Sequence, residues 1–178
     1  MSAARGNSAR AETAAELPDA ASVIQQMAPS PAPDLTFTDA KGKPLSLANY
    51  RGSGLVVNIW ATWCIACVAE LPSFVAISQT LAKSKILILP ISVDFGGAQV
   101  VADYYRRHQI KSLPLLVDPD GNVAGALNVP GIPVTIIVNP AGQLTGRRDG
   151  GANWNTAGSL ALIERLAGQA SGNTQQPT

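Results

Sequence analysis

Cysteine, histidine and charged residues are all scarce in this 178-residue chain. Two cysteines and one histidine are too few for a structural zinc site, which takes about four such ligands. Lys and Arg number 13 against 12 Asp and Glu, so the basic excess typical of nucleic-acid binding is missing. No run of about 18 apolar residues occurs, so no membrane-spanning helix is expected. The N-terminus lacks the basic-then-apolar pattern of a secretory signal, which leaves either a cytoplasmic protein or one whose leader was removed.

Apolar side chains make up 46% of the chain and charged ones 14%, which fits one folded domain. We expect this domain at residues 34–168. Residues 1–33 are rich in Ala and Ser and close with prolines, which predicts a flexible tether with room for one short helix. Residues 169–178 hold no large apolar side chain and are predicted to be a disordered tail.

Strand and helix patterns alternate between residues 34 and 168. The sequence predicts an opening hairpin around the turn 39–42, strands at 54–60, 86–93, 113–117, 134–138 and 143–148, and helices at 64–83, 99–108 and 156–167. Pro90 removes a ladder donor, so we expect a bulge or an early end of the strand at that position. The order of elements predicts an α/β fold with a central mixed sheet and helices on both faces.

The two cysteines lie three residues apart, where a predicted strand gives way to a predicted helix. Open α/β sheets carry their functional groups at this edge. A cysteine in the first helical turn meets unpaired N–H groups and the positive end of the helix dipole, which favour a thiolate. Cys64 is therefore predicted to be nucleophilic near neutral pH, and Cys67 has the spacing of its disulfide partner. Because so small a loop adds little stability, we expect this disulfide to serve exchange.

The segment 60–67 (Trp-Ala-Thr-Trp-Cys-Ile-Ala-Cys), followed by Glu70-Leu71-Pro72, resembles the active-site segment of the thioredoxin superfamily. More narrowly, it resembles the thiol:disulfide reductases of the TlpA/ResA type. Residues 45–52 are similar to the entry hairpin of that group, and Gly131-Ile132-Pro133 matches its cis-proline loop. The resemblance covers about residues 34–168. It implies a thioredoxin-like fold with an N-terminal β-hairpin and a central α/β insertion.

The resemblance also implies a place and a set of partners. Its members are bacterial envelope proteins, periplasmic or membrane-anchored facing the periplasm, that keep partner cysteines reduced. The implied partners are disulfide-containing substrate proteins, among them apocytochrome c or proteins that assemble the copper site of cytochrome oxidase, and a membrane thiol electron donor. Beyond the Cys64–Cys67 disulfide no cofactor is expected, and no metal site. The chain departs from the group in lacking both a proline between the cysteines and the membrane anchor.

Glu70 lies three residues after Cys67 and can share its helix face. The resemblance places a proton-handling acid at this position. If Trp60 and Trp63 shield the carboxyl, its pKa is raised and it can accept the proton of Cys67; the alternative is an exposed helix glutamate. Asn58 stands where thioredoxins proper carry a buried acid, and we expect a buried amide bonded to the backbone.

Pro133 is a candidate cis proline, because cis bonds favour tight turns; an ordinary trans proline at a strand start is the alternative. Its missing N–H would leave the backbone of Ile132 free to pair with an extended substrate. Trp63 is expected to be partly exposed, as an apolar rim of the substrate-binding surface.

Four other polar residues are expected to take no part in the chemistry. Asp94 ends a strand and is read by default as a turn residue, although it lies at the functional edge. His108 is predicted to cap a helix C-terminus. Arg147 and its neighbour Arg148 are expected to be a solvated pair.

The sequence leaves two alternatives to a reductase. Peroxiredoxins share the sheet order, but their pattern has Thr three residues before the reactive cysteine, where this chain has Ala61. A Cu(I)-binding or docking module would use both thiolates, yet no Met or His is close in sequence to add a third ligand. No basic residue such as His lies between the cysteines to stabilise the thiolate strongly, which favours a reductant over an oxidant. We therefore predict a protein-disulfide reductase in which Cys64 attacks and Cys67 resolves the mixed disulfide.

Overall fold

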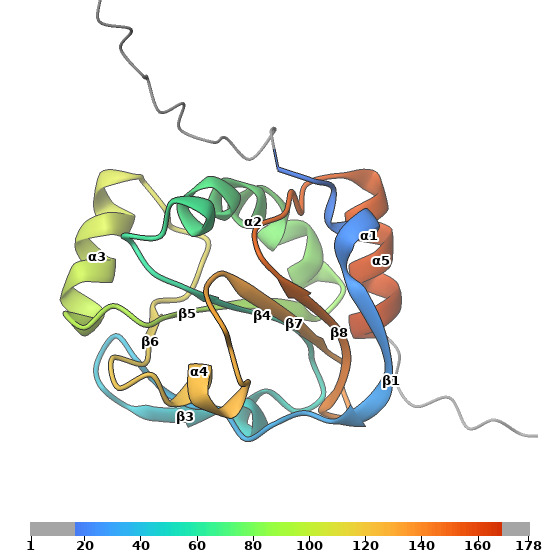
Figure 1. The fold of residues 1–178 in the computed structure, drawn as a ribbon, viewed down its shortest axis with the longest axis horizontal. Helices are drawn as coiled ribbons and strands as arrows, with labels where there is room; N and C mark the ends of the chain where they lie inside the picture. The colour runs from blue at the N-terminus through green and yellow to red at the C-terminus, as the bar shows by residue number, and fades with distance from the viewer. Residues whose placement is uncertain (1–16, 169–178) are drawn as a thin grey trace, which may run out of the picture.

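The computed structural model describes residues 17–168, so the predicted tail at 169–178 and the first 16 residues lie outside it. Its centre is an eight-stranded sheet with the order β1-β8-β7-β4-β5-β6-β2-β3 (Figure 1). The strands are β1 (Gln25–Pro31), β2 (Thr36–Asp39), β3 (Pro44–Ser46), β4 (Gly54–Trp60), β5 (Ile86–Ser92), β6 (Leu116–Val117), β7 (Val134–Val138) and β8 (Gln143–Asp149). The helices are α1 (Ala20–Val23), α2 (Ile65–Lys83), α3 (Gly97–Arg107), α4 (Asn122–Ala126) and α5 (Ala157–Gly168), with a 3-10 turn at Leu47–Tyr50. β4 pairs in parallel with β5 and antiparallel with β7, which confirms the predicted mixed sheet.

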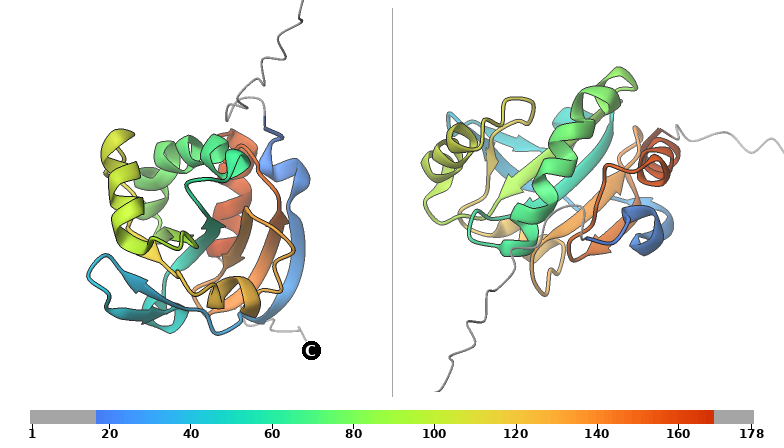
Figure 2. Two further views of the ribbon diagram at one scale, coloured as in Figure 1. Left: turned by 60° about the vertical axis from the view of Figure 1, so that its left-hand side comes forward. Right: turned by 90° about the horizontal axis from the view of Figure 1, so that it is seen from above.

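Helices cover both faces of the sheet, as the sequence predicts. α1, α2, α3 and α5 pack on one face, and α4 packs on the other (Figure 1, Figure 2). Side chains of β4 alternate between these two cores: Val56 and Trp60 lie in the first, Val57 and Ile59 in the second. Because a strand points successive side chains to opposite faces and both faces are covered, β4 is buried along its whole length.

Residues 17–33 belong to the fold, which corrects the predicted tether over this range. The short helix is present as α1, and β1 pairs antiparallel with β8, from Gln25 opposite Arg147 to Pro31 opposite Gln143. β1 is one of the two edge strands of the sheet, and its side chains are mostly exposed. An edge strand tolerates proline, so the prolines that indicate a linker in the sequence are equally compatible with this strand.

β5 runs straight through Pro90, so the expected bulge or early end is wrong. Pro90 stands opposite Asn58 in the parallel ladder with β4, and the strand continues to Ser92. On its other side β5 pairs with β6 only at Ile91 and Ser92. Pro90 therefore has no strand partner on that side, and its missing N–H breaks no hydrogen bond there.

Among residues 17–168, α2 alone is long and apolar enough to cross a membrane, with a mean hydropathy of 1.5. Half of that stretch is buried against the rest of the protein. This is the pattern of a core helix, and its first turn carries the cysteine pair.

Candidate active site

Cys64 and Cys67 form a disulfide at the carboxyl end of β4, with their Cα atoms 5.2 Å apart. Cys64 is the N-cap residue of α2, and the backbone N–H of Cys67 donates to its Sγ at 3.2 Å. The same N–H would stabilise a Cys64 thiolate after reduction, together with the helix dipole. Cys64 keeps 8% of its surface exposed, whereas Cys67 has none. An incoming disulfide can therefore reach only Cys64, which fits the predicted division of roles.

The peptide bond between Ile132 and Pro133 is cis, as predicted. The carbonyl oxygen of Ile132 lies 3.6 Å from Cys64 Sγ, so this loop lies directly beside the disulfide. Within the described residues the N–H of Ile132 donates to no backbone carbonyl. Among residues 17–168 this N–H therefore has no backbone acceptor, and it lies in the loop next to the reactive sulfur.

An open groove of about 600 Å³ runs past the disulfide. Its lining carries no charged side chain and consists of Trp63, Cys64, Ile65, Ala66, Val93, Ala124, Val129, Gly131 and Ile132. Trp63 is 63% exposed, in keeping with the predicted apolar rim. This open, uncharged surface beside the disulfide suits contact with apolar parts of another polypeptide.

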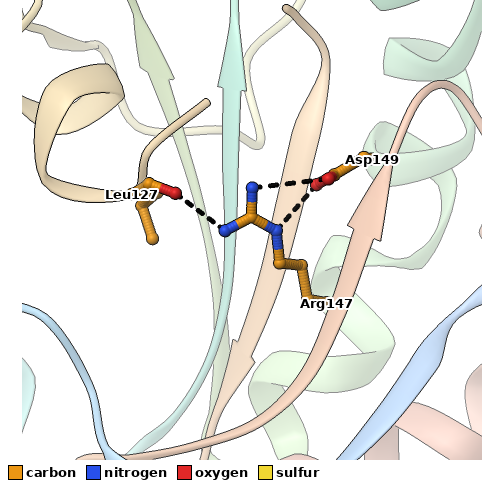
Figure 3. A network of polar contacts seen from close by, with 3 residues as sticks. All are labelled: Leu127, Arg147 and Asp149. Atoms are coloured by element: carbon orange, nitrogen blue, oxygen red, sulfur yellow. Dashed lines mark hydrogen bonds and ion pairs between the residues drawn. The ribbon is translucent and has the colours of Figure 1, made fainter. Parts of the chain in front are cut away.

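Arg147 is bonded to the end of α4, the helix whose Ala124 lines this groove, which corrects the prediction of a solvated pair. Its Nη1 donates to the carbonyl of Leu127 at the end of α4 at 2.8 Å, and its Nε pairs with Asp149 at 2.7 Å (Figure 3). The side chain is only 21% exposed. Arg148 points elsewhere and donates to the carbonyl of Gly151 at 3.3 Å.

Glu70 is fully buried, so the exposed-glutamate alternative is wrong. Its Oε1 accepts from Asn58 Nδ2 at 2.7 Å, and its Oε2 accepts from the Ala152 N–H at 3.1 Å and from Trp154 Nε1 at 3.2 Å. Burial raises the pKa of Glu70 to about 7, although these three hydrogen bonds and the charge of Arg148 oppose the rise. A carboxyl with a pKa near neutrality can take up and release a proton under physiological conditions.

The hydrogen-bond partners of Asn58 are side chains, whereas the sequence led us to expect the backbone. It is buried as expected, but its amide nitrogen donates to Glu70 Oε1 and to Thr135 Oγ1 at 2.9 Å rather than to the backbone. Asn58 thus connects β4 and β7 to the carboxyl group on α2.

Trp154 is the site residue that sequence reasoning missed. It lies between β8 and α5, far along the chain from the cysteines, and no motif surrounds it. The one available signal was its type: a tryptophan in a chain with few aromatic residues is often buried with its N–H bonded. The structure places it at the Glu70 carboxylate.

A mixed sheet with helices on both faces, a disulfide at the start of α2 and a cis proline beside it define a thioredoxin-like protein. The family model described as "AhpC/TSA family" matches residues 29–147, and the chain belongs to this family. It is 30% identical over 115 residues to the thiol-disulfide oxidoreductase ResA of Geobacillus kaustophilus, covering 65% of each chain. It is 29% identical to ResA of Bacillus subtilis, over 65% of this chain and 63% of the relative. These relatives confirm the resemblance to the TlpA/ResA type, although the chain spans less than two thirds of their length.

Solved structures agree on the fold. The exposed lipoprotein thioredoxin of Streptococcus pneumoniae matches with a TM-score of 0.60 and 26% identity, over 75% of this chain and 99% of that one. The thioredoxin domain of a thiol-disulfide oxidoreductase from Bacteroides vulgatus matches with a TM-score of 0.65 and 21% identity, over 79% and 99% of the two chains. The predicted thioredoxin-like fold is confirmed.

Proposed function

We propose that the protein is a thiol:disulfide oxidoreductase that reduces disulfides of other proteins in the bacterial envelope. The observation that carries this proposal is the asymmetry of the cysteine pair. Cys64 lies at a helix start with part of its surface open to an uncharged groove, and Cys67 lies fully buried behind it. The relatives named as thiol-disulfide oxidoreductases support the same chemistry.

The reaction transfers two electrons in two exchange steps. The Cys64 thiolate attacks one sulfur of the substrate disulfide; a mixed disulfide forms, and the other substrate sulfur leaves as a thiolate. Cys67 then gives its proton to the Glu70 carboxylate and attacks Cys64 Sγ. This forms the Cys64–Cys67 disulfide and releases the second substrate sulfur. A thiol donor outside this chain must return the pair to the dithiol.

Glu70 is proposed as the proton acceptor for Cys67. Both residues lie on α2, three positions apart, and both are fully buried, so water has no direct access to the proton. A pKa of about 7 suits an acid that must alternate between its two forms. Ile132 and Trp63 are proposed to contact the substrate, with Pro133 shaping the loop.

The proposed setting is the periplasmic side of the envelope, with assembly proteins of cytochrome c or of the copper site of cytochrome oxidase as substrates and a membrane thiol transporter as donor. The support is the TlpA/ResA-type resemblance and the structural likeness to an exposed lipoprotein thioredoxin. Trapping identifies the substrates: Cys67→Ser leaves the mixed disulfide on Cys64 unresolved, so partners stay attached. The matched control is the variant that also carries Cys64→Ser, which should retain none of them.

The activity is tested by the reduction of insulin disulfides. Wild type should reduce insulin with a thiol donor present, and Cys64→Ser should abolish the reaction. A reduction potential more negative than about −180 mV is expected, and a more positive one would place the protein among isomerases and oxidants.

Peroxide consumption tests the peroxiredoxin-like alternative. We expect none above the Cys64→Ser background, because Ala61 occupies the position of the peroxiredoxin threonine.

A further inference from the structure

Within residues 17–168, three donors reach the Glu70 carboxylate, and two of them come from one loop outside the cysteine motif. This loop, residues 150–156, joins β8 to α5. Its Ala152 N–H and its Trp154 indole N–H both reach Oε2, and only Asn58 reaches Oε1. The position of the carboxylate therefore depends on a segment more than 80 residues away in the sequence.

Packing holds the indole of Trp154 in one orientation. The side chain has no exposed surface, and its ring stacks on Phe74 of α2 with centroids 5.3 Å apart and planes 21° apart. Its backbone N–H donates to the hydroxyl of Ser73 at 3.2 Å. The indole N–H consequently has a fixed direction, and that direction is toward Glu70.

The N-terminal part of the described chain holds the loop from its other side. The N–H of Asn153 donates to the carbonyl of Pro18 at 2.8 Å, and the N–H of Ala20 donates to the carbonyl of Asn153 at 3.0 Å. Asp19 also accepts from the hydroxyl of Thr156, the last residue of the loop, at 2.9 Å. Hydrogen bonds thus hold the loop on both sides, to residues 18–20 and to α2.

The charged and titratable groups near the Glu70 carboxyl are few. Arg148 on β8 acts on it by its charge, and Cys67 lies one turn earlier on α2. Since Asn58 and Trp154 are neutral, their hydrogen bonds act on the carboxyl without a titration of their own. A loss of one of these bonds should therefore act directly on the ionisation of Glu70.

We propose that Trp154 is a positioning residue: its indole N–H orients the Glu70 carboxylate and favours the ionised form that accepts the proton of Cys67. The inference rests on the proton-acceptor role proposed above. In the resolution step the Cys67 S–H bond breaks, the proton goes to Glu70, and the new sulfur–sulfur bond displaces the substrate thiolate from Cys64.

The test is Trp154→Phe in the full chain, because phenylalanine keeps a ring to stack on Phe74 and lacks the N–H. Reduced protein reacts with dithiobis(nitrobenzoate) in two phases: attack by Cys64 and then resolution by Cys67, each releasing one coloured thiolate. In wild type we expect the second phase to inflect near pH 7, following Glu70. In the variant the inflection should rise by about one pH unit, the worth of one hydrogen bond to a charge. The pH profile of the first phase should stay as it is.

A purely structural role of Trp154 would slow the second phase alike at every pH, and an unmoved inflection would overturn the proposal. Carbon NMR of the Glu70 carboxyl group gives an independent measurement. Its titration should move upward in Trp154→Phe, and an unchanged titration also overturns the proposal. If Glu70→Gln leaves the second phase and its pH profile intact, the proton-acceptor role of Glu70 fails instead, and the inference fails with it.

Discussion

Asp94 accepts two hydrogen bonds from Thr62, one from its backbone N–H at 2.9 Å and one from its hydroxyl at 2.7 Å. Asp94 follows β5, and Thr62 lies two residues before Cys64. A third hydrogen bond comes from the Ser92 hydroxyl at 2.7 Å, so the buried carboxylate is well partnered. Asp94 therefore does more than form a turn: it fixes the loop that leads into α2 and presents Cys64.

This contact predicts a graded loss of stability. Asp94→Ala removes the acceptor for all three donors and should lower the free energy of unfolding by about 2 to 3 kcal/mol. Thr62→Val removes one hydroxyl donor and should cost about 1 kcal/mol. Urea unfolding of the oxidised proteins measures both values. Equal midpoints for Asp94→Ala and wild type would show that the loop does not depend on this carboxylate.

Because the pKa of Glu70 is raised, we expect the free energy of unfolding to fall as the pH rises. Burial raises its pKa from 4.5 to about 7, so between these values the folded protein keeps a proton that the unfolded chain has lost. The folded state binds more protons in this window, and stability therefore falls as the pH rises through it. The loss amounts to about 3 kcal/mol.

Glu70→Gln does not titrate and should lack this component. Urea unfolding of the oxidised wild type and variant, at pH values below and above the window, gives the comparison. The difference in stability between the two proteins should change by about the same 3 kcal/mol across the window. Parallel curves for the two proteins would mean that the folded carboxyl titrates near its ordinary pKa.

We expect the bond from Arg147 to the Leu127 carbonyl to stabilise the end of α4 locally (Figure 3). Arg147→Met removes the donor to the Leu127 carbonyl, so amide hydrogen exchange over residues 122–131 should become faster. Global stability should change by no more than about 1 kcal/mol, because Asp149 is half exposed and such ion pairs contribute little. Asp149→Asn is the matched control, since it weakens the ion pair and leaves the bond to Leu127. Faster exchange in both variants would assign the effect to the charge pair instead.

Most strands and helices and the cysteine pair could be predicted because their signals are local, whereas the short helix α4 was not predicted and β6 covers only the last two residues of the predicted strand at 113–117. β4 is a run of apolar, β-branched residues with the bounds that the pattern gives, and Cys64 lies where that strand ends and α2 begins. Glu70 follows Cys67 at a helical spacing, so its place on the cysteine helix could be read from the chain. β1 escaped prediction because an exposed edge strand with prolines has the composition of a linker.

The polar network of the site could not be predicted, because its members are distant in sequence. Trp154 meets Glu70 across 84 positions, and Thr62 meets Asp94 across 32. No periodicity joins such residues, and only the packing of the sheet and helices brings them together. Asn58 shows the same limit: its burial could be expected from the strand, but the choice of side chains over backbone as partners could not.

We expect the side chain of Phe95 to matter for the reaction with protein substrates but not with small disulfides. The large apolar side chains that are exposed within residues 17–168 are Trp63, Ile65 and Phe95, and Phe95 is the most exposed at 91%. Trp63 and Ile65 flank Cys64. Phe95 follows Asp94, whose bonds to Thr62 place it beside the same loop. Trp63 and Ile65 line the groove at the disulfide. We expect Phe95 to extend this apolar margin, where a partner protein would have to approach.

Phe95→Ser should leave stability within about 0.5 kcal/mol of wild type, because the side chain packs against little in the free protein. With a protein substrate whose cysteines have apolar neighbours, kcat/KM should fall roughly tenfold, since burial of a phenylalanine is worth about 1.5 kcal/mol or more. The reaction of Cys64 with dithiobis(nitrobenzoate) should keep its rate, because a small disulfide does not extend to Phe95. An equal loss with both substrates would place the effect in the chemistry of Cys64, and no loss with either would mean that partners dock without this margin.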